Sequence, residues 1–370
     1  MRVQVVDPPA YTLPYDRSLC AALGAAGADV ELVTSPFVHG PVHALEGFEV
    51  TEHFYRGSAR RGLDAVGRVP HKAIEHVSGM YRLRRRTGGT DLVHYQWLEL
   101  AAVDWLLLPR QRPRALTAHG TLRGSSPGWG ARRVYDRMDA VVALSEYGAA
   151  KLRDQAGVPA QRVRVIPHGP LDYLTRIPTP APLPAELDSS DRPVVLFFGI
   201  VRSYKGVDVL LDAFRELGRP DAELWIVGRV LDVDFADLCA RARRASGTIR
   251  FVSRFVADRE IPAVFERADL VVLPYREVEQ SGVLYLALAF GKPIVMSSVG
   301  GFPEVAAHGV GRLVPPGDSK ELAAVIGDLL DRPEERGRLA NAARAAASGP
   351  YSWDRIADAH LALYRELLAG

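Results

Sequence analysis

The segment 197–206 places two cations beside a glycine-hinged turn. It reads Phe-Phe-Gly-Ile-Val-Arg-Ser-Tyr-Lys-Gly, so Gly199 opens the turn and Arg202 and Lys205 follow it. An apolar run precedes the turn and apolar residues at helical spacing follow it, which predicts a strand-to-helix connection. The carboxyl ends of strands in open α/β sheets are where such folds bind ligands. A guanidinium with a mobile ammonium there suits a diphosphate, although two surface cations on an ordinary turn explain the same pattern.

A second segment has the features of an anion site. Ser281 and Gly282 follow an apolar strand, Leu270–Leu273, and open a helical run that reaches Phe290. The free N–H groups and the dipole of a helix N-terminus favour an anion. Gly282 lets a phosphate approach the backbone closely. The alternative is an ordinary N-cap, in which Ser281 caps its own helix.

The elements around these segments alternate between strand and helix patterns. In the first half the predicted strands are Arg2–Val6, Val30–Thr34, Leu92–Tyr95, Ala115–Ala118, Ala140–Leu144 and Val163–Pro167. A proline-rich linker, 177–184, separates them from a second set: Val194–Phe198, Leu224–Val227, Arg250–Val252, Leu270–Leu273 and Ile294–Ser297. This alternation predicts an α/β protein of two doubly wound parallel-sheet domains facing across a cleft.

Composition agrees with that class. The chain has 370 residues, 48% of them hydrophobic, with a mean hydropathy of −0.02, which suits a globular protein of two domains. Cys20 and Cys239 are too few for a disulfide framework or a zinc site. The first residues resemble a strand instead of a signal peptide, and runs such as 106–108 are far short of a membrane span. We therefore expect a cytoplasmic protein.

Basic residues gather between Arg56 and Arg86. The segment holds Arg56, Arg60, Arg61, Arg68, Lys72, Arg82, Arg84, Arg85 and Arg86 against only Asp64 and Glu75. Such a cluster suits an anionic membrane, including the inner membrane face, or an acidic acceptor. A solvated helix face explains it equally well. No nucleic-acid-binding signature accompanies the cluster, so no nucleic-acid partner is expected.

The order of these motifs resembles the nucleotide-sugar half of glycosyltransferase family 4, the retaining enzymes of GT-B fold. The matching segments are Gly199…Arg202…Lys205-Gly206, Gln280-Ser281-Gly282, Ala289–Val295 and Val299–Glu304. Further matches are Asp139–Ser145, Val165–Gly169 and Tyr351–Trp353. The resemblance implies two Rossmann-like domains. Residues 1–175 would bind the acceptor, with the terminal helix 352–370 completing that domain, and residues 190–350 would bind the nucleotide sugar.

The resemblance also implies roles for individual residues. Arg202 and Lys205 match the pair that binds the donor diphosphate, and His119 matches a histidine that faces the donor sugar. The other donor-binding positions that it implies are Gly199, Glu279, Ser281, Gly282, Val283 and the turn at Phe255. The family's members use no cofactor: the nucleotide-diphosphate sugar is a substrate, and the acceptor hydroxyl attacks from the leaving-group side.

The sequence contains one pattern that suggests a metal. Asp232-Val233-Asp234 spells Asp-x-Asp, but it directly precedes a helical pattern, 235–244. Capping of that helix and complementarity to its dipole explain the two carboxylates better than a metal does. We expect a metal-independent enzyme, in which Arg, Lys and a helix terminus offset the charge on the leaving diphosphate.

Two departures from the family's pattern affect substrate recognition. Leu286 stands where the family has the second of two glutamates, and the segment from Glu279 is one residue short. The loop Asp7–Asp16 lacks the family's paired glycines. We interpret this loop as an acceptor wall, with Tyr15 and Asp16 as its polar contacts.

The sequence is compatible with other functions. The absence of the family's second glutamate at Leu286 is compatible with a relative that uses a non-sugar donor or has hydrolytic activity. A nicotinamide oxidoreductase is disfavoured because no Gly-x-Gly-x-x-Gly follows the first strand. A non-catalytic nucleotide-binding or membrane-surface protein would use 56–86 as its contact. For a transferase, the hydroxyl acceptor could be a polysaccharide, a glycolipid or a natural product.

Overall fold

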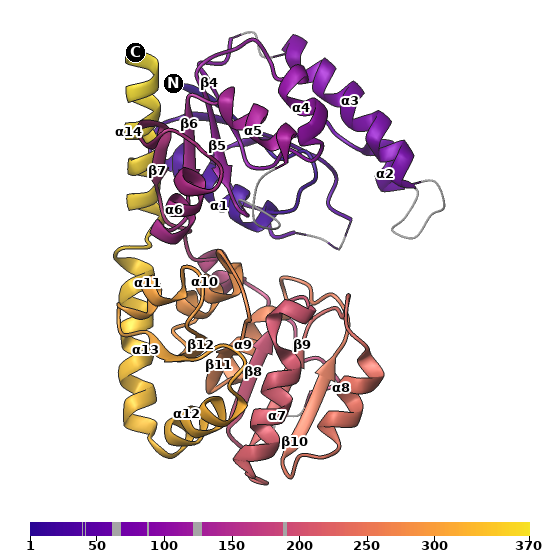
Figure 1. Ribbon diagram of the computed structural model, residues 1–370, viewed down its shortest axis with the longest axis vertical. Helices are drawn as coiled ribbons and strands as arrows, with labels where there is room; N and C mark the ends of the chain where they lie inside the picture. The colour runs from indigo at the N-terminus through magenta and orange to yellow at the C-terminus, as the bar shows by residue number, and fades with distance from the viewer. Residues whose placement is uncertain (39, 41, 61–67, 87–88, 121–127, 188–190) are drawn as a thin grey trace. The chain divides into compact units, whose positions relative to one another are not determined.

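The computed structural model describes residues 1–370 apart from 39, 41, 61–67, 87–88, 121–127 and 188–190 (Figure 1). The chain divides into two compact units. The first is Met1–Gly169 with Tyr351–Gly370, and the second is Pro170–Pro350. Each holds a parallel sheet with helices, so the predicted α/β class with two Rossmann-like domains is confirmed.

The first unit is built on seven parallel strands in the order β3-β2-β1-β4-β5-β6-β7. They are β1 (Arg2–Val6), β2 (Asp29–Thr34), β3 (Glu49–Glu52), β4 (Leu92–Tyr95), β5 (Arg114–Ala118), β6 (Ala140–Ala143) and β7 (Val163–Val165). The helices are α1 (Leu13–Ala25), α2 (Arg56–Arg60), α3 (Arg68–Arg86), α4 (Ala101–Leu107), α5 (Trp129–Asp136), α6 (Glu146–Asp154), the 3-10 turn η1 (Ala160–Arg162) and α14 (Trp353–Ala369). Strand β3 was not predicted, because it is a polar, largely exposed edge strand.

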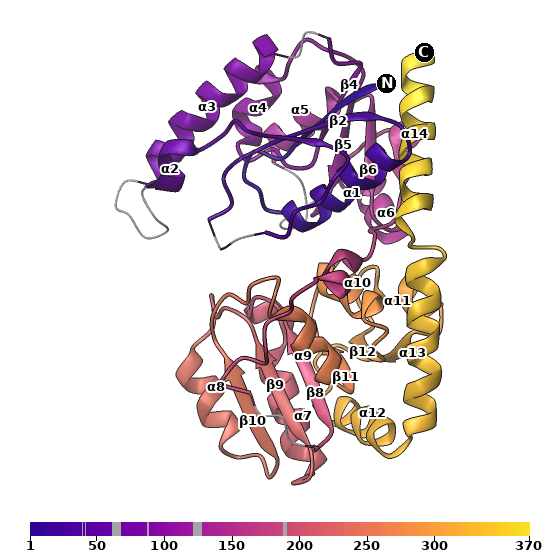
Figure 2. The same ribbon diagram turned by 180° about the vertical axis from the view of Figure 1, so that it is seen from behind.

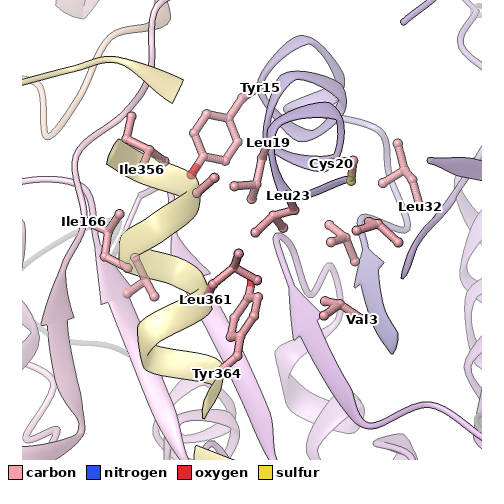
Figure 3. Packing of buried hydrophobic residues seen from close by; sticks show 14 of the residues in the cluster. Val3, Tyr15, Leu19, Cys20, Leu23, Leu32, Ile166, Ile356, Leu361 and Tyr364 are labelled. Carbon is pink, nitrogen blue, oxygen red and sulfur yellow. The ribbon is translucent and has the colours of Figure 1, made fainter. Parts of the chain in front are cut away.

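Alternation along the strands divides the core of this unit between two faces. Val3 and Val5 of β1 point to α1 and α14, whereas Val6 joins the cluster under α3 and α5. Figure 3 shows the first cluster, in which α1 and α14 pack over the sheet. The C-terminal helix is therefore part of the core of the first unit (Figure 2).

A buried polar contact joins α14 to the sheet. His94 of β4 forms hydrogen bonds with the Tyr364 hydroxyl (2.6 Å) and with Thr117 Oγ1 of β5 (2.8 Å). Burial lowers the pKa of His94, and lowers that of neighbouring His360 to about 4. Both rings are therefore neutral at neutral pH, as a buried imidazole requires.

The second unit is built on six parallel strands in the order β10-β9-β8-β11-β12-β13. They are β8 (Val194–Phe198), β9 (Glu223–Val227), β10 (Thr248–Val252), β11 (Leu270–Leu273), β12 (Ile294–Ser297) and β13 (Gly311–Val314). The helices are η2 (Asp172–Arg176), η3 (Ser203–Lys205), α7 (Val207–Leu217), α8 (Phe235–Ala242), α9 (Ile261–Arg267), α10 (Gly282–Ala289), α11 (Phe302–Ala306), α12 (Ser319–Asp331) and α13 (Pro333–Ser348). Because η2 packs on α9 and α10, the second unit begins before the predicted boundary at 175.

The strand order reverses once in each sheet. The reversal lies between β1 and β4 in the first unit and between β8 and β11 in the second. The crevice outside the carboxyl ends of the strands at such a switch point is the usual ligand site of a doubly wound sheet. The predicted anion-binding segments follow β8 and β11, so they lie at the switch point of the second unit.

Candidate active site

The turn after β8 contains a 3-10 turn before its helix begins. Gly199 has φ +105° and donates its N–H to Val227 O at 2.9 Å. Arg202 precedes η3, and Gly206 (φ +66°) links η3 to α7. Both glycines adopt backbone conformations that L side chains rarely occupy.

Gly206 also lies against the loop that follows β11. A Cβ atom built on it would be 2.0 Å from Pro274 O. The N–H of Arg276 donates to Tyr204 O at 2.7 Å, and the Arg276 guanidinium donates to Ser203 O at 2.8 Å. The loops after two neighbouring strands are therefore locked backbone to backbone at the candidate site.

We predict that Gly206→Ala lowers the free energy of unfolding by about 3 kcal/mol, because left-handed strain adds to a backbone clash. The matched control is Gly218→Ala at the end of α7. Gly218 has φ +63°, but its Cβ would meet only Glu216 O, at 3.9 Å, so strain alone should cost about 1 kcal/mol. Urea unfolding measures both. Equal costs for the two variants would show that the loops are not locked as described.

Lys205 brings the two predicted anion segments together. A Cβ built on Gly199 would be 3.3 Å from Lys205 Nζ and 3.0 Å from Val283 Cγ2 of α10. Lys205 Nζ also lies 5.3 Å from the centre of the Tyr275 ring, whose hydroxyl is 3.4 Å from Ser281 Oγ. The ammonium thus lies between the turn after β8 and the start of α10.

The charge of Lys205 has no counter-ion in the part of the chain that the structure describes. Its side chain is buried, with 8% of the residue exposed, and no carboxylate there lies within ion-pair distance of Nζ. Burial lowers the pKa of Lys205, and nearby Arg202 lowers it further. A buried cation without a partner is costly, so the site favours an anionic ligand that would neutralise it.

The N-terminus of α10 is open to such a ligand. Ser281 occupies the N-cap position and is buried, but its side chain accepts no capping hydrogen bond from the helix. The first N–H groups of α10 are therefore not satisfied by this serine, contrary to the ordinary-cap alternative. Gly282 and Val283 form the first turn beside Lys205.

Arg202 is positioned by an acid on the neighbouring loop. Its guanidinium lies 3.7 Å from Asp232 Oδ2, and Asp232 Oδ1 accepts the N–H of Ser203 at 2.8 Å. Of the two carboxylates in the Asp-x-Asp segment, Asp234 caps α8 as predicted, by accepting the N–H of Ala236 at 2.8 Å, whereas Asp232 contacts the turn after β8. Within the described residues, no group of three or more His, Cys, Asp or Glu side chains could hold a metal ion.

A cavity of about 600 Å³ borders Arg202 on the α7–α8 side. Its lining includes Tyr204, Asp208, Asp237, Arg241 and Arg276. Arg276 pairs with Asp208 through two hydrogen bonds of 2.9 and 2.6 Å. The lining is of mixed charge and does not include Lys205, Gly199 or Ser281, so this cavity adjoins the anion site and is distinct from it.

The remaining donor-side residues lie near α10 or on a more distant loop. Glu279 accepts the N–H of Gly301 at its backbone oxygen (3.3 Å). Leu286 is an apolar residue of α10 and is buried in the core, so it does not contact a ligand as the family's glutamate would. Phe255 follows β10 and is 41% exposed.

In the first unit, His119 follows β5 and is held by its neighbours. His119 Nε2 and Gln96 Oε1 form a hydrogen bond of 2.8 Å, which makes Nε2 the protonated nitrogen. The ring stacks on Trp97 and meets Tyr15 edge to face. Burial lowers the pKa of His119 to about 3, with His168 contributing, so the ring is neutral at neutral pH.

Tyr15 and Asp16 are not in a loop, contrary to the sequence prediction. Both lie in the first turns of α1, which begins at Leu13, because Pro14 is tolerated at the start of a helix. The Tyr15 ring packs against the rings of His119, His168 and Trp353. Burial raises the pKa of the Tyr15 hydroxyl. Asp16 is fully buried, so neither side chain forms an exposed acceptor wall.

Asp16 belongs to a buried carboxyl pair. It forms hydrogen bonds with Thr12 Oγ1 and with the carboxyl of Asp7, which follows β1. Burial raises the pKa of both acids, and their mutual repulsion raises that of Asp16 further. Burial and this repulsion therefore disfavour a state in which both carboxylates are charged at once.

Sequence reasoning missed several residues of these sites. Tyr275 and Asp232 hold Lys205 and Arg202, and each follows a predicted strand by only a few residues. Gln96, Trp97 and Glu99 directly follow β4. Their place after a buried strand was a usable signal, since strand carboxyl ends are where polar site residues gather.

Comparisons with known proteins agree with this architecture. The family model described as Glycosyl transferases group 1 matches residues 183–346, and the model described as Glycosyltransferase Family 4 matches residues 17–170. The chain is 30% identical over 309 residues to alpha-D-kanosaminyltransferase of Streptomyces kanamyceticus, covering 77% of this chain and 79% of that protein. It is 30% identical over 382 residues to D-inositol 3-phosphate glycosyltransferase of Xylanimonas cellulosilytica, covering 95% and 90% respectively.

Solved structures show the same fold. Sucrose-phosphate synthase of Thermosynechococcus elongatus has a TM-score of 0.75 at 21% identity, with 100% of this chain and 99% of that chain covered. Anabaena Alr3699/HepE in complex with UDP-glucose has a TM-score of 0.69 at 20% identity, with the same coverage. The family models and the relatives at 30% identity favour a glycosyltransferase over the nicotinamide oxidoreductase and the non-catalytic protein. The chain is a glycosyltransferase of GT-B type, and it belongs to glycosyltransferase family 4.

Proposed function

We propose that this protein is a metal-independent, retaining glycosyltransferase that moves a sugar from a nucleoside-diphosphate sugar to a hydroxyl acceptor. The observation that carries the proposal is the buried ammonium of Lys205. It has no carboxylate partner among the described residues and lies beside Gly199 and the start of α10. A diphosphate bound there would satisfy both the ammonium and the free N–H groups of the helix.

The proposed chemistry needs positive charge where the leaving group forms. The bond between the sugar C1 and the distal phosphate oxygen breaks, and a bond from the acceptor oxygen to C1 forms on the same face. The acceptor proton passes to the departing phosphate oxygen. Lys205, Arg202 and the N–H groups of α10 would stabilise the developing charge, which is worth about 3–4 kcal/mol for one preorganised donor.

Other residues take supporting roles in the proposal. Asp232 would hold the Arg202 guanidinium in place, and the Tyr275 ring would position the Lys205 ammonium through a cation–π contact. Glu279 and the turn at Phe255 remain predicted donor contacts. His119, as a neutral ring, would contact the donor sugar as a hydrogen-bonding group and not as a cation.

The names of relatives support a nucleotide sugar without fixing it. One relative of Mycolicibacterium smegmatis, 29% identical over 343 residues, is a GDP-mannose-dependent phosphatidylinositol monomannoside mannosyltransferase. HepE was solved with UDP-glucose. The donor base of this chain is therefore to be found by testing several nucleotides, and its acceptor among natural products, polysaccharides and glycolipids.

The proposal is tested by incubating the protein with nucleoside-diphosphate sugars and sugar or cyclitol acceptors, and following the anomeric proton by NMR. We expect a product with the donor's anomeric configuration, formed at the same rate with and without EDTA. An inverted product would contradict retention, and loss of the reaction in EDTA would contradict metal independence. Release of free sugar without transfer would show a hydrolase.

We also propose that the first unit contacts an anionic membrane peripherally. Of the predicted basic segment, Arg61 and Asp64 lie outside the described residues. On α3, Ile74, Val77 and Tyr81 form an exposed apolar stripe, and Ile74 is 70% exposed. Arg82, Arg84 and Arg85 lie at the end of the same helix. Exposed apolar side chains flanked by arginines are typical of helices that lie on membrane surfaces.

Neighbouring helices extend this surface. Trp105 of α4 and Trp129 of α5 meet edge to face, with Arg133 5.5 and 5.3 Å from their ring centres. The Arg84 guanidinium donates to Leu106 O, which joins α3 to α4. None of the helices in the described part of the chain has the length and apolar character needed to cross a membrane.

We predict that the protein sediments with vesicles that contain phosphatidylglycerol and not with pure phosphatidylcholine vesicles. Binding should fall at least tenfold between 0.1 and 0.5 M salt, because surface charge is screened. Replacing Arg82, Arg84 and Arg85 together by Glu should abolish it. The control replaces two exposed arginines of the second unit, Arg332 and Arg338, by Glu. Salt-independent binding, or equal loss in the control, would contradict this surface.

A further inference from the structure

The loop after β4 holds polar atoms that have no partner among the described residues. Gln96 is 1% exposed, and its Oε1 is engaged by His119 while its Nε2 has no hydrogen-bond partner. Trp97 Nε1 and Glu99 Oε2 are also buried and unpaired. Three such atoms on four consecutive residues are unusual, because buried polar groups are nearly always hydrogen-bonded.

These atoms lie at the switch point of the first sheet. The loop follows β4, whose neighbour β1 leads into the segment that holds Tyr11. The Tyr11 hydroxyl donates to Glu99 Oε1 at 3.0 Å, and its ring meets Trp97 edge to face. The unpaired atoms therefore lie where a doubly wound sheet binds ligands.

The types of these atoms select a ligand chemistry. The Gln96 amide and the Trp97 indole offer donors, and Glu99 Oε2 offers an acceptor. Adjacent hydroxyl groups, which both donate and accept, satisfy such a set. The half-buried Trp97 and exposed Tyr11 rings supply apolar surface for the C–H face of a sugar or cyclitol ring.

The charges at this place disfavour an anion. Glu99 is joined by the buried pair Asp7 and Asp16, and the charge of Glu99 contributes to raising the pKa of Asp7. Among the described residues, Lys72 places a cation here: its Nζ lies 3.4 Å from Glu99 Oε1 and lies over the Tyr11 and Tyr55 rings. Lys72 is thus already matched by Glu99, so a phosphate here would lie near the buried acids Asp7 and Asp16 without an unmatched cation among the described residues to neutralise it.

We infer that Gln96, Trp97 and Glu99 form the acceptor subsite, and that it takes a polyhydroxylated ring with no anionic substituent at the bound edge. This rests on the proposed function only in making the ring the acceptor of the sugar. It replaces Tyr15 and Asp16, which are buried in α1, as the source of acceptor specificity.

The test measures ring binding directly, without turnover. Titration calorimetry of the full chain would use myo-inositol, methyl α-D-glucopyranoside, glucosamine and inositol 3-phosphate. Trp97→Phe keeps an aromatic ring at this position but removes the indole N–H. Glu99→Gln removes the negative charge of the carboxylate. Trp129→Phe is the matched control, because Trp129 is 60% exposed on α5 and lies outside this loop. Thermal unfolding checks that each variant folds.

We expect at least one of the three phosphate-free rings to bind wild type, and inositol 3-phosphate to bind at least tenfold more weakly than myo-inositol. Trp97→Phe should weaken binding about tenfold and Trp129→Phe should not. Glu99→Gln should reduce the difference in affinity between myo-inositol and inositol 3-phosphate. The inference is overturned if no phosphate-free ring binds, if the phosphate binds more tightly, or if Trp97→Phe and Glu99→Gln behave as wild type. A nucleoside diphosphate titrated in parallel tests the donor site, so that its failure would count against the proposed function alone.

Discussion

Lys205→Met should lower the turnover number by about a hundredfold or more while the protein stays folded. The methionine fills the space of the lysine stem but carries no charge, so the diphosphate loses a preorganised cation in the transition state. Lys205 Nζ lies beside Gly199 and Val283, where the donor phosphates are proposed to bind. Steady-state kinetics with saturating donor measures the effect.

The same substitution should stabilise the protein in the absence of ligand. The pKa of Lys205 is lowered in the folded state, so the charged side chain opposes folding below that pKa. This cost is relieved as the pH rises from the folded toward the unfolded pKa. At neutral pH, Lys205→Met should therefore melt at a higher temperature than wild type, and the difference should shrink at alkaline pH.

Lys292→Met is the matched control for Lys205→Met. Its ammonium is also partly buried in the second unit, but it donates to Glu266 O at 3.0 Å and Ala268 O at 2.8 Å. Loss of the Lys292 ammonium should lower the stability of the protein and leave its turnover within a few fold of wild type. Wild-type turnover in Lys205→Met, or an equal loss in the control, would contradict the assigned role of Lys205.

Arg202→Ala should also lower turnover about a hundredfold, because the second cation of the site is lost. Arg202→Lys should recover only part of the loss, since an ammonium cannot offer the planar fork that matches a phosphate. Asp232→Asn should have a smaller effect of the same kind, because it frees the guanidinium that Asp232 orients at 3.7 Å. The three variants are compared by kcat and KM for the donor.

Arg241→Ala separates this role from general loss of charge. Arg241 lines the neighbouring cavity and pairs with Asp212 and Asp237, so its loss should change kcat less than threefold. If Arg241→Ala is as damaging as Arg202→Ala, the effect belongs to the whole basic surface and not to the proposed phosphate contact.

The parallel sheets could be predicted from sequence because their central strands are buried on both faces. Val194–Phe198, Leu270–Leu273 and Ile294–Ser297 are continuous apolar runs, and the structure gives them the predicted bounds. The edge strands Glu49–Glu52 and Gly311–Val314 were missed, because their partly exposed residues follow no apolar pattern. Their pairing with an adjacent strand defines them more than their composition does.

The candidate site was predicted in parts. Residue types and helix position pointed to Lys205 and Ser281 separately, and the structure brings them together through Tyr275, which no local pattern links to either. Tyr15 and Asp16 were interpreted as part of a loop, but they lie in the first turns of α1, where Pro14 fits. The unpaired atoms of the loop after β4 follow only from tertiary packing.

The central claim is that Lys205 and the start of α10 bind a diphosphate without a metal. The most direct measurement is titration calorimetry of UDP, GDP, ADP and TDP into wild type and Lys205→Met, with and without EDTA. We predict that at least one diphosphate binds wild type equally in both conditions and binds Lys205→Met at least tenfold more weakly. Binding that requires a metal, binding that survives the loss of Lys205, or no binding of any diphosphate to folded wild type would contradict the account.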